Sequence, residues 1–215
     1  LEIGWGWGGF MEIAATHGCH VTGATLSGEQ ADYARQRLES AGLAENAEVR
    51  LQDYRELSGP FDYLVSIGMF EHVGESYWPA YMRDVHDYLR PGGKAMIQTI
   101  TIAEERFERY RSGNDFLREH IFPGGMLPSR KRFEAVAADS GLDGDLEQLT
   151  RDQVLETQTK CPAARLCLIA VHHNGQRVNR IAIDQNTEFD QIALLVAVQM
   201  VVEAGIAAAD RFQPV

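Results

Sequence analysis

The first ten residues, LEIGWGWGGF, combine an acidic residue with closely spaced glycines. Two ligand-binding patterns overlap in this run. Gly4, Gly6 and Gly9 form G-x-G-x-x-G, which is typical of dinucleotide sites. Glu2 opens an acidic-x-G-x-G-x-G run, which is typical of S-adenosylmethionine (SAM) sites. Glycine suits both ligands, because a backbone without a side chain lets a ligand approach closely.

The residues after the second predicted strand favour one of these two ligands. A dinucleotide site needs an acidic residue about 20 positions beyond the loop, where it binds the ribose. This chain has Thr-Leu-Ser at 25–27 instead. SAM carries a cation, a ribose and an amino-acid tail but no phosphate, so it suits carboxylates. Asp53 and Glu71 follow the third and fourth predicted strands, and we therefore expect SAM rather than NAD.

The elements that must position these residues alternate between strand and helix. Ser27 and Gln30 have the spacing of a capping box, Gly42 is a helix stop signal, and a Pro-Gly-Gly turn at 91–93 ends another helix. This alternation predicts an α/β fold with a parallel sheet and a ligand site at the carboxyl ends of the strands. Predicted strands cover 1–3, 20–26, 47–51, 61–67 and 94–102, and predicted helices cover 10–17, 28–41 and 77–89.

The pattern changes beyond residue 102. Residues 103–140 are polar and predicted helical, with a break at the Phe-Pro-Gly-Gly of 122–125. An Asn-Gly pair at 174–175 predicts a hairpin over 166–184, and an Ala/Val-rich stretch predicts a helix over 188–210. We therefore divide the chain into a core of residues 1–140 and a tail of residues 141–215.

Composition narrows the class of partner. The chain has 215 residues, 45% of them hydrophobic, and a net charge of −11. Such acidity argues against a nucleic-acid partner. Cys19, Cys161 and Cys167 lack metal-site spacing, so we expect no metal and reduced thiols. The apolar run at 192–209 includes Glu203, which argues against a membrane span.

Over residues 1–134 the chain resembles the cyclopropane-fatty-acyl-phospholipid synthase family, which includes the mycolic acid cyclopropane synthases. The combination of FEHVG after the fourth strand with TLSxEQ after the second makes the resemblance specific. It implies a Rossmann-like class I SAM-dependent methyltransferase sheet. It also implies a cytoplasmic enzyme, peripheral on the inner membrane face, that acts on phospholipid acyl chains. The matching runs are LEIGWGWGGF, VTGATLSGEQ, LQDYRE, FDYLVSIGMFEHVG, LRPGGKAMIQTIT and IFPGGMLPS.

The resemblance also implies a role for individual residues. Glu71 would lie in the active site, where the family binds bicarbonate, and Gln98 stands where well-studied members carry histidine. Gly4 and Gly6 would contact SAM through their backbone. Further SAM contacts would come from Thr25, Leu26 and Gln30 for the ribose and methionine parts, and from Gln52, Asp53 and Tyr54 for the adenine.

The implied reaction is transfer of a methylene group from SAM to the double bond of an unsaturated phospholipid acyl chain. An alkene is a poor nucleophile, so the sulfonium must be held in line with it. The carbocation that forms must be kept from water and stabilised by negative charge or aromatic faces. In the family, bicarbonate then removes a proton, and Glu71 would orient it by accepting its O–H. Two alternatives stay open: transfer of a plain methyl group to an acyl chain or small molecule, and an inactive SAM-binding fragment.

Several features depart from the family pattern. Trp5 replaces the usual cysteine of the loop, and Gln98 cannot titrate as histidine does. The family has a catalytic tyrosine beyond its PGGxLPS run, but no tyrosine follows Tyr110 here. Beyond about Gly141 we find no resemblance, which indicates a divergent or frameshifted tail. The chain also opens inside a predicted strand, so we expect a fragment truncated at its N-terminus, without the family's N-terminal region.

Structural roles are alternatives for some of these residues. Glu71 could serve as a negative charge at the N-terminus of the following helix. Trp5 and Trp7 are expected to pack the loop. The predicted helix over 104–120 could meet lipid head groups through its arginines or present a solvated face, because glutamates are interleaved with them. These arginines are Arg106, Arg109, Arg111 and Arg118.

Overall fold

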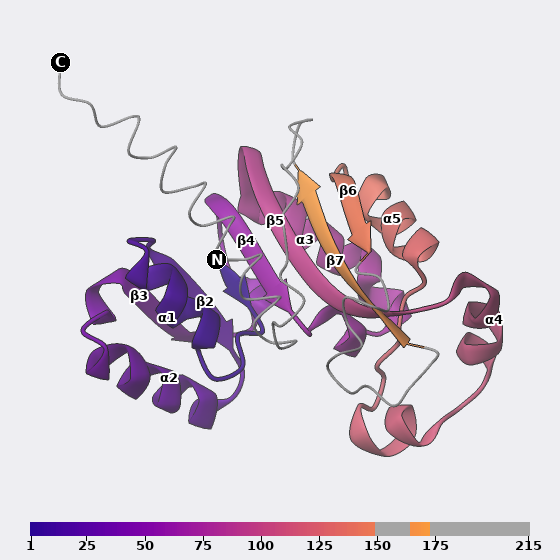
Figure 1. Ribbon diagram of the computed structural model, residues 1–215, viewed down its shortest axis with the longest axis horizontal. Coiled ribbons are helices and arrows are strands. Elements are labelled where there is room, and N and C mark those ends of the chain that lie inside the picture. The colour runs from indigo at the N-terminus through magenta and orange to yellow at the C-terminus, as the bar shows by residue number, and fades with distance from the viewer. Residues whose placement is uncertain (149–163, 173–215) are drawn as a thin grey trace. The chain divides into compact units, whose positions relative to one another are not determined.

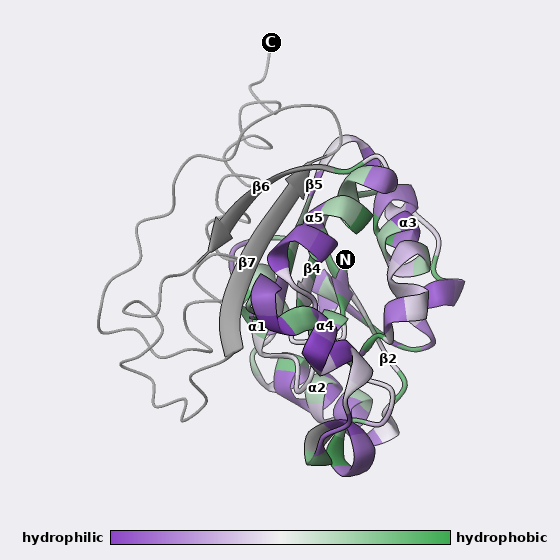
Figure 2. Cartoon of the chain, turned by 90° about the vertical axis from the view of Figure 1, so that its right-hand side faces the viewer, coloured by the Kyte–Doolittle hydropathy of each residue, from purple (hydrophilic) through white to green (hydrophobic). Residues whose placement is uncertain are grey.

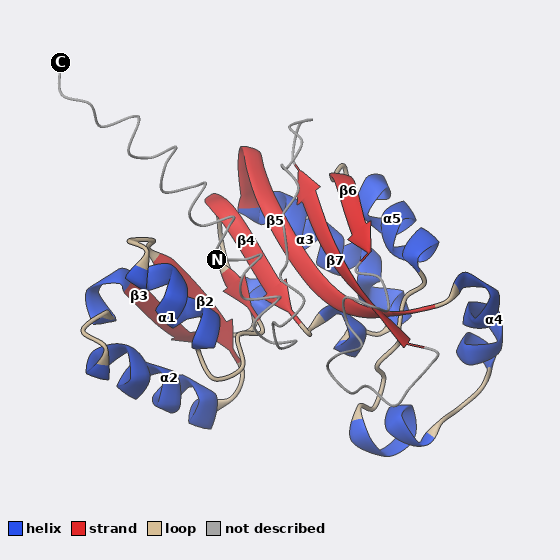
Figure 3. Cartoon of the chain, in the orientation of Figure 1, coloured by secondary structure: helices blue, strands red, loops and turns tan. Residues whose placement is uncertain are grey.

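The computed structural model describes residues 1–148 and 164–172. The described residues form two compact units, the first of residues 1–57 and the second of residues 58–148 and 164–172. Each unit combines strands with helices (Figures 1 and 3). The strand–helix alternation predicted for residues 1–102 is therefore present in the chain.

The first unit is a small parallel sheet with two helices. Strand β1 pairs with β2, and β2 pairs with β3, all in parallel. Glu2 lies opposite Gly23, and Thr25 lies opposite Leu51. Parallel pairing brings the ends of these strands, and the loops that follow them, to one edge. The elements are β1 (Glu2–Ile3), α1 (Gly9–Thr16), β2 (Val21–Thr25), α2 (Gly28–Ser40) and β3 (Ala47–Leu51), with 3-10 turns at Ala44–Asn46 and Tyr54–Glu56.

The start of α2 confirms half of the predicted capping box. The hydroxyl of Ser27 accepts a hydrogen bond from the backbone N–H of Gln30, at 3.2 Å. The reciprocal contact is replaced, because the side chain of Gln30 accepts from the Thr25 hydroxyl at 3.0 Å. The Ser27 backbone N–H donates to that same hydroxyl, at 3.2 Å. The side chain of Gln30 is thereby tied to the end of β2, while its backbone N–H remains bound to the Ser27 cap.

The second unit is a mixed sheet with the strand order β4-β5-β7-β6. Strand β4 pairs with β5 in parallel, whereas β7 is antiparallel to both β5 and β6. Short 3-10 turns, η3 (Phe70–His72) and η4 (Glu75–Tyr77), connect β4 to α3. The other elements are β4 (Phe61–Ile67), α3 (Trp78–Tyr88), β5 (Leu89–Ile102), α4 (Glu104–Ser112), the π-helical turn η5 (Leu117–Ile121), α5 (Arg130–Asp139), β6 (Asp143–Gln148) and β7 (Ala164–His172).

An aromatic cluster around Phe70 forms the core of the second unit. The Phe70 ring is fully buried and lies 5.4 Å from Trp78, 5.3 Å from Tyr81 and 4.9 Å from Phe133, measured between ring centroids. The Tyr81 hydroxyl donates to Ser66 on β4 at 2.7 Å. Such aromatic packing stabilises both by area and by ring geometry. It therefore anchors η3 against α3 and α5.

The Pro-Gly-Gly segment differs from its prediction, because it lies inside β5 rather than before it. Phe61 pairs with Leu89, and Tyr63 pairs with Lys94. Strand β4 thus advances by two residues while β5 advances by five, which makes residues 90–93 a bulge. A Cβ on Gly93 would lie 3.1 Å from the carbonyl oxygen of Asp62. Only glycine leaves room for this close approach.

The predicted hairpin over 166–184 is described only in part. Its first residues lie in β7, which pairs with β5 and β6, whereas the Asn-Gly turn at 174–175 lies outside the described residues. The predicted helix over 188–210 and the apolar run at 192–209 lie outside the described residues. Within the described ranges, no helix is both long enough and apolar enough to cross a membrane.

The predicted helix over 104–120 is interrupted. Helix α4 ends at Ser112, and η5 begins five residues later; Figure 2 shows α4 as largely hydrophilic. Arg111 forms an ion pair with Glu75 at 2.7 Å. Arg118 pairs with Asp115 at 2.8 Å and lies over the Tyr110 ring. These two arginines are therefore engaged within the protein.

The bulge in β5 predicts a large cost for a side chain at residue 93. In Gly93→Ala the new Cβ would lie 2.9 Å from the carbonyl oxygen of Arg90, so we expect the free energy of unfolding to fall by about 1–3 kcal/mol. Gly28→Ala is the control, because a Cβ there meets no atom within 4 Å and should stabilise by about 0.4–1 kcal/mol. Urea denaturation measures both, and equal effects of the two substitutions would contradict the bulge.

Candidate functional site

The glycine loop of the first unit adopts a backbone that suits glycine. Gly4, Gly6 and Gly8 have φ values of 72°, 55° and 77°. A Cβ on Gly8 would lie 2.9 Å from the Cβ of Ala34 on α2, whereas a Cβ on Gly6 would meet nothing within 4 Å. The loop is thus closely packed at Gly8 and open at Gly6. A ligand can reach the backbone at the open position.

Trp5 is buried in the first unit and packs against β2. A Cβ on Gly23 would lie 2.6 Å from both the Trp5 ring and the sulfur of Met11. The large ring at residue 5 is therefore accommodated by the absence of a side chain at residue 23. Trp7 is half exposed and makes an edge contact with Tyr33, with centroids 5.4 Å apart. Both tryptophans pack the loop, as the sequence predicted.

Glu2 is a buried acid without a full set of partners. Its side chain is 2% exposed, and its Oε2 atom has no hydrogen-bond partner. Burial raises the pKa of Glu2 to about 8, although the positive charge of the amino group at Leu1 and a hydrogen bond with the backbone of Met11 act in the opposite direction. At neutral pH this acid is therefore largely protonated, because moving a carboxylate charge into the interior is costly.

The ends of β2 and β3 bring three predicted SAM contacts together. The Thr25 hydroxyl donates to the side chain of Gln30, and the backbone N–H of Gln52 donates to the carbonyl of Thr25, both at 3.0 Å. Leu26 beside them is 74% exposed. With Gly4 and Gly6 these residues are predicted to bind one ligand. We call Gly4, Gly6, Thr25, Leu26, Gln30 and Gln52 the loop cluster.

Asp53 and Tyr54 follow β3 as predicted. The Asp53 carboxylate accepts from the backbone N–H and the Nε of Arg55, each at 3.0 Å. These hydrogen bonds lower the pKa of Asp53 below its usual value. Asp53 is therefore ionised at neutral pH and already has a partner, while Tyr54 begins the 3-10 turn beyond it.

The second unit brings Glu71 and Gln98 together at Gly68. Both side chains are buried, with exposed fractions of 8% and 2%. A Cβ on Gly68 would lie 3.7 Å from Oε1 of Gln98 and 4.0 Å from Oε1 of Glu71. The other oxygen of Glu71, Oε2, accepts a hydrogen bond from the Thr99 hydroxyl at 2.9 Å. We call Gly68, Glu71, Gln98 and Thr99 the carboxylate cluster.

The carboxyl of Glu71 is buried and accepts hydrogen bonds. Burial raises the pKa of Glu71, while hydrogen bonds from its own backbone and from Thr99 act in the opposite direction. The alternative role of Glu71 at the N-terminus of the following helix does not fit, because α3 begins only at Trp78. Thr99 and Gly68 were not predicted from the sequence, since their contacts depend on how β4 and β5 align.

The Phe-Pro-Gly-Gly segment packs against η3. The backbone N–H of Met126 donates to the carbonyl of Glu71 at 2.9 Å. A Cβ on Gly125 would lie 3.0 Å from that same carbonyl oxygen, so glycine is required for the contact. The rings of His72 and Phe122 lie 4.5 Å apart. This segment therefore fixes the backbone that carries Glu71.

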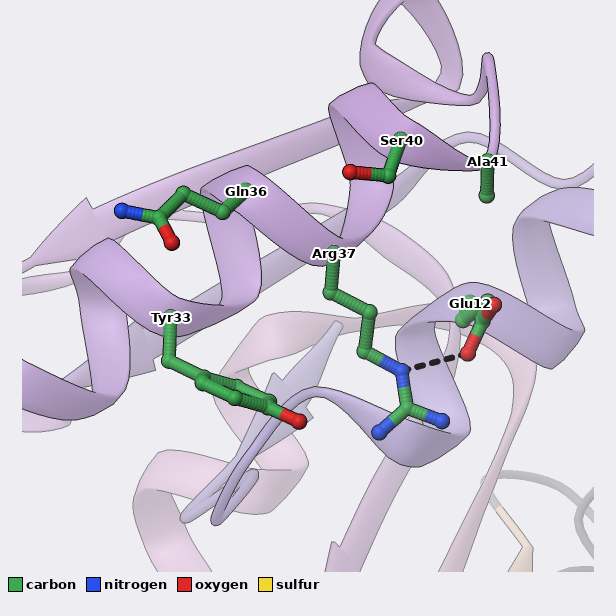
Figure 4. Close-up of a pocket in the computed structure, with 6 residues that line it drawn as sticks. All are labelled: Glu12, Tyr33, Gln36, Arg37, Ser40 and Ala41. Carbon is green, nitrogen blue, oxygen red and sulfur yellow. Dashed lines mark hydrogen bonds and ion pairs between the residues drawn. The ribbon is translucent and has the colours of Figure 1, made fainter.

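A hollow between α1 and α2 contains none of the predicted site residues. It has a volume of about 430 Å³ (Figure 4). Arg37 and Glu12 form an ion pair across it, so its strongest charges satisfy each other. Elsewhere in the described ranges, no group of His, Cys, Asp or Glu side chains is arranged to bind a metal ion. The hollow is lined by Glu12, Tyr33, Gln36, Arg37, Ser40 and Ala41.

Comparisons with known proteins identify a family that this chain matches. Residues 1–159 match the family model of mycolic acid cyclopropane synthetase. The chain is 43% identical over 129 residues to tuberculostearic acid methyltransferase UfaA1 of Mycobacterium tuberculosis, covering 60% of this chain and 30% of that protein. It is 37% identical over 130 residues to the cyclopropane-fatty-acyl-phospholipid synthase of Escherichia coli K12, covering 60% and 32%. The chain thus spans about a third of the length of these relatives.

A solved structure shows the same fold. The mycolic acid cyclopropane synthase CmaA1, complexed with SAH and CTAB, aligns with a TM-score of 0.67 at 22% identity. The alignment covers 80% of this chain and 76% of CmaA1. The predicted Rossmann-like SAM-dependent methyltransferase sheet is therefore confirmed. The family match runs to residue 159, so the expectation that the resemblance stops near Gly141 was wrong for residues 142–159.

The buried acid of the first unit predicts a pH-dependent stability. The native pKa of Glu2, about 8, is above its ordinary value of 4.5, so the native state binds more protons between these values and loses stability as pH rises through them. Glu2→Gln removes this loss. Between pH 5 and pH 8 we expect the free energy of unfolding of Glu2→Gln, measured relative to wild type, to increase by a few kcal/mol. The increase is on the order of 1.4 kcal/mol per pH unit at most.

Urea denaturation at both pH values measures this difference. Glu39→Gln, at an exposed position of α2, serves as the control and should show a difference that is constant with pH. A Glu2→Gln difference that is also constant would show that Glu2 is not buried as a neutral acid.

The packing of Trp5 predicts a coupling with residue 23. In Gly23→Ala the new Cβ would overlap the Trp5 ring, so we expect a loss of about 1–3 kcal/mol in the free energy of unfolding. In a Trp5→Cys background, which restores the family's usual residue, the same substitution should cost less than about 1 kcal/mol, because Met11 can move aside. A double-mutant cycle measures the coupling, and additive effects would rule out the contact.

Proposed function

The chain belongs to the mycolic acid cyclopropane synthetase family, and from this membership we propose that it is a SAM-dependent methyltransferase. Its proposed reaction is transfer of a methylene group to the double bond of an unsaturated phospholipid acyl chain. The observation that carries the proposal is the buried Glu71 carboxyl beside Gln98. Such a dry carboxyl can stabilise positive charge that develops on an alkene, because electrostatic interactions are strong where water is excluded.

The loop cluster has the chemistry to hold SAM. The open backbone at Gly6, the hydroxyl of Thr25 and the amides of Gln30 and Gln52 provide neutral donors and acceptors for a ribose and an amino-acid tail. The exposed Leu26 offers an apolar surface. When bound, SAM supplies a methyl group on a sulfonium. Gly4, Asp53 and Tyr54 complete the proposed set.

The carboxylate cluster has donors and acceptors that suit bicarbonate. Glu71 accepts hydrogen bonds when ionised, and the Gln98 amide can donate one. An ion with both an O–H and bare oxygens can satisfy such a pair. When bound, bicarbonate supplies a base for ring closure. Glu71 and Gln98 would hold and orient it, and Gly68 leaves space beside both side chains.

Transfer of a plain methyl group is the second candidate function. Gln98 stands where well-studied members carry histidine and cannot take part in proton transfer. The relative with 43% identity is named as a methyltransferase rather than as a cyclopropane synthase. Both observations favour a product without a ring. The acceptor would again be an acyl chain, either in a phospholipid at the cytoplasmic membrane face or in a smaller molecule.

Product analysis tests these functions. Purified protein is incubated with SAM and vesicles of an unsaturated phosphatidylglycerol, and the released acyl chains are analysed by mass spectrometry and NMR. We expect a mass gain of one CH₂ group with loss of the olefinic protons. Glu71→Gln should lower kcat about a hundredfold or more, whereas the exposed-site control Glu39→Gln should not.

Other outcomes of this assay would favour one of the alternative functions. A mass gain with the olefin retained identifies plain methyl transfer. Calorimetric titration with SAM covers the third possibility, an inactive SAM-binding fragment, which would bind SAM but give no product. If SAM does not bind, both enzymatic functions are excluded for this chain.

A further inference from the structure

The hydroxyl of Thr99 donates a hydrogen bond to the carboxylate of Glu71. Its side chain is fully buried in β5, and its hydroxyl lies 2.9 Å from Oε2 of Glu71. The alternative acceptor, the carbonyl of Ile100, is 3.5 Å away. A hydroxyl has a single proton to donate, so the shorter and charge-assisted bond to Glu71 is favoured.

The backbone of Glu71 is fixed from two other sides. Phe70, the residue before it, is held in the aromatic cluster of the core. The carbonyl of Glu71 accepts the backbone N–H of Met126. With the backbone held in this way, the side-chain torsions are what remain to be determined. The hydrogen bond from the Thr99 hydroxyl, together with those from backbone N–H groups of Glu71 and Ile100, selects among them.

Thr99 engages one oxygen of the Glu71 carboxylate, and the other oxygen lies beside Gly68. Oε2 points to Thr99, whereas Oε1 lies on the side of Gly68, where the Gln98 side chain also lies. We propose that Thr99 is a positioning residue, which binds Oε2 of Glu71 so that Oε1 is presented to the ligand beside Gly68 and Gln98. This inference rests on the proposed function, in which Glu71 orients the base.

The same hydrogen bond affects the ionisation of Glu71. Burial raises the pKa of Glu71, and the bond from Thr99 acts against this rise. The imidazole of His72, on the same turn, also lowers the pKa, as do backbone N–H groups of η3 and β5. Removal of the hydroxyl therefore raises the pKa of Glu71 further. The ionised fraction that can accept a hydrogen bond at neutral pH then falls.

Three substitutions separate the hydroxyl of Thr99 from its shape. Thr99→Val keeps the branched shape without the donor, and Thr99→Ser keeps the donor. Thr101→Val makes the same change at a buried threonine two residues further along β5 and is the matched control. Should Thr99→Val not fold, a comparison of Thr99→Ala with Thr99→Ser makes the same distinction in a smaller side chain.

Two measurements are made on each variant. The first is the pH dependence of kcat and of KM for SAM with phosphatidylglycerol vesicles. For Thr99→Val we expect about a tenfold loss of kcat at neutral pH, an acid limb shifted upward by about one pH unit, and an unchanged KM. The second is an infrared titration of the Glu71 carboxyl, identified by its absence in Glu71→Gln, which should show the same upward shift. Thr99→Ser and Thr101→Val should match wild type.

The infrared titration stays informative if the proposed function fails. A wild-type protein without methyl transfer would refute the proposed function, while the carboxyl midpoints would still test Thr99. Equal midpoints in wild type and Thr99→Val would overturn the inference. The same conclusion follows if Thr99→Ser behaves as Thr99→Val, or if Thr101→Val shifts the midpoint equally.

Discussion

The alignment of β4 with β5 determines where the carboxylate of Glu71 lies. Ile67 pairs with Gln98, and the next backbone N–H, that of Gly68, donates to the Gln98 carbonyl at 3.1 Å. The chain turns at Gly68, whose φ is 62°, and enters η3, which brings Glu71 against Thr99. A slip of one residue would exchange the faces of the strand. The carboxylate cluster therefore depends on a single register between two parallel strands.

Three acidic residues, Glu2 in β1 and Asp53 and Glu71 after β3 and β4, have different electrostatic environments. Glu2 is buried with an unpartnered oxygen, and its pKa rises to about 8. Glu71 is also buried, but hydrogen bonds partly oppose the effect of burial. Asp53 is held by Arg55, which lowers its pKa. Desolvation and partners thus separate an acid that is largely protonated at neutral pH, a buried carboxyl whose pKa rise is partly opposed by hydrogen bonds and a carboxylate stabilised in its ionised form.

Sequence patterns predicted the elements with strong local signals. The strands at 47–51 and 61–67 and the start of α2 at Ser27 agree with the structure. Strand β6 was missed, because its sequence DGDLEQ lacks apolar alternation and forms through pairing with β7. Glu71 and Gln98 were identified from family motifs. Thr99, Gly68 and Gly23 were not, since each acts through a contact between strands or between strand and loop that only the folded chain creates.

The bulge of β5 separates two parts of that strand from one another. On one side Leu89 pairs with Phe61, and on the other Lys94 begins an uninterrupted ladder that continues to Gln98. An insertion or deletion within residues 90–93 would change the size of the bulge and leave the ladder beyond it in place. The length of the segment at the start of the strand is thereby uncoupled from the position of the carboxylate cluster. Related chains can vary in length here during evolution without moving the residue that stands opposite Ile67.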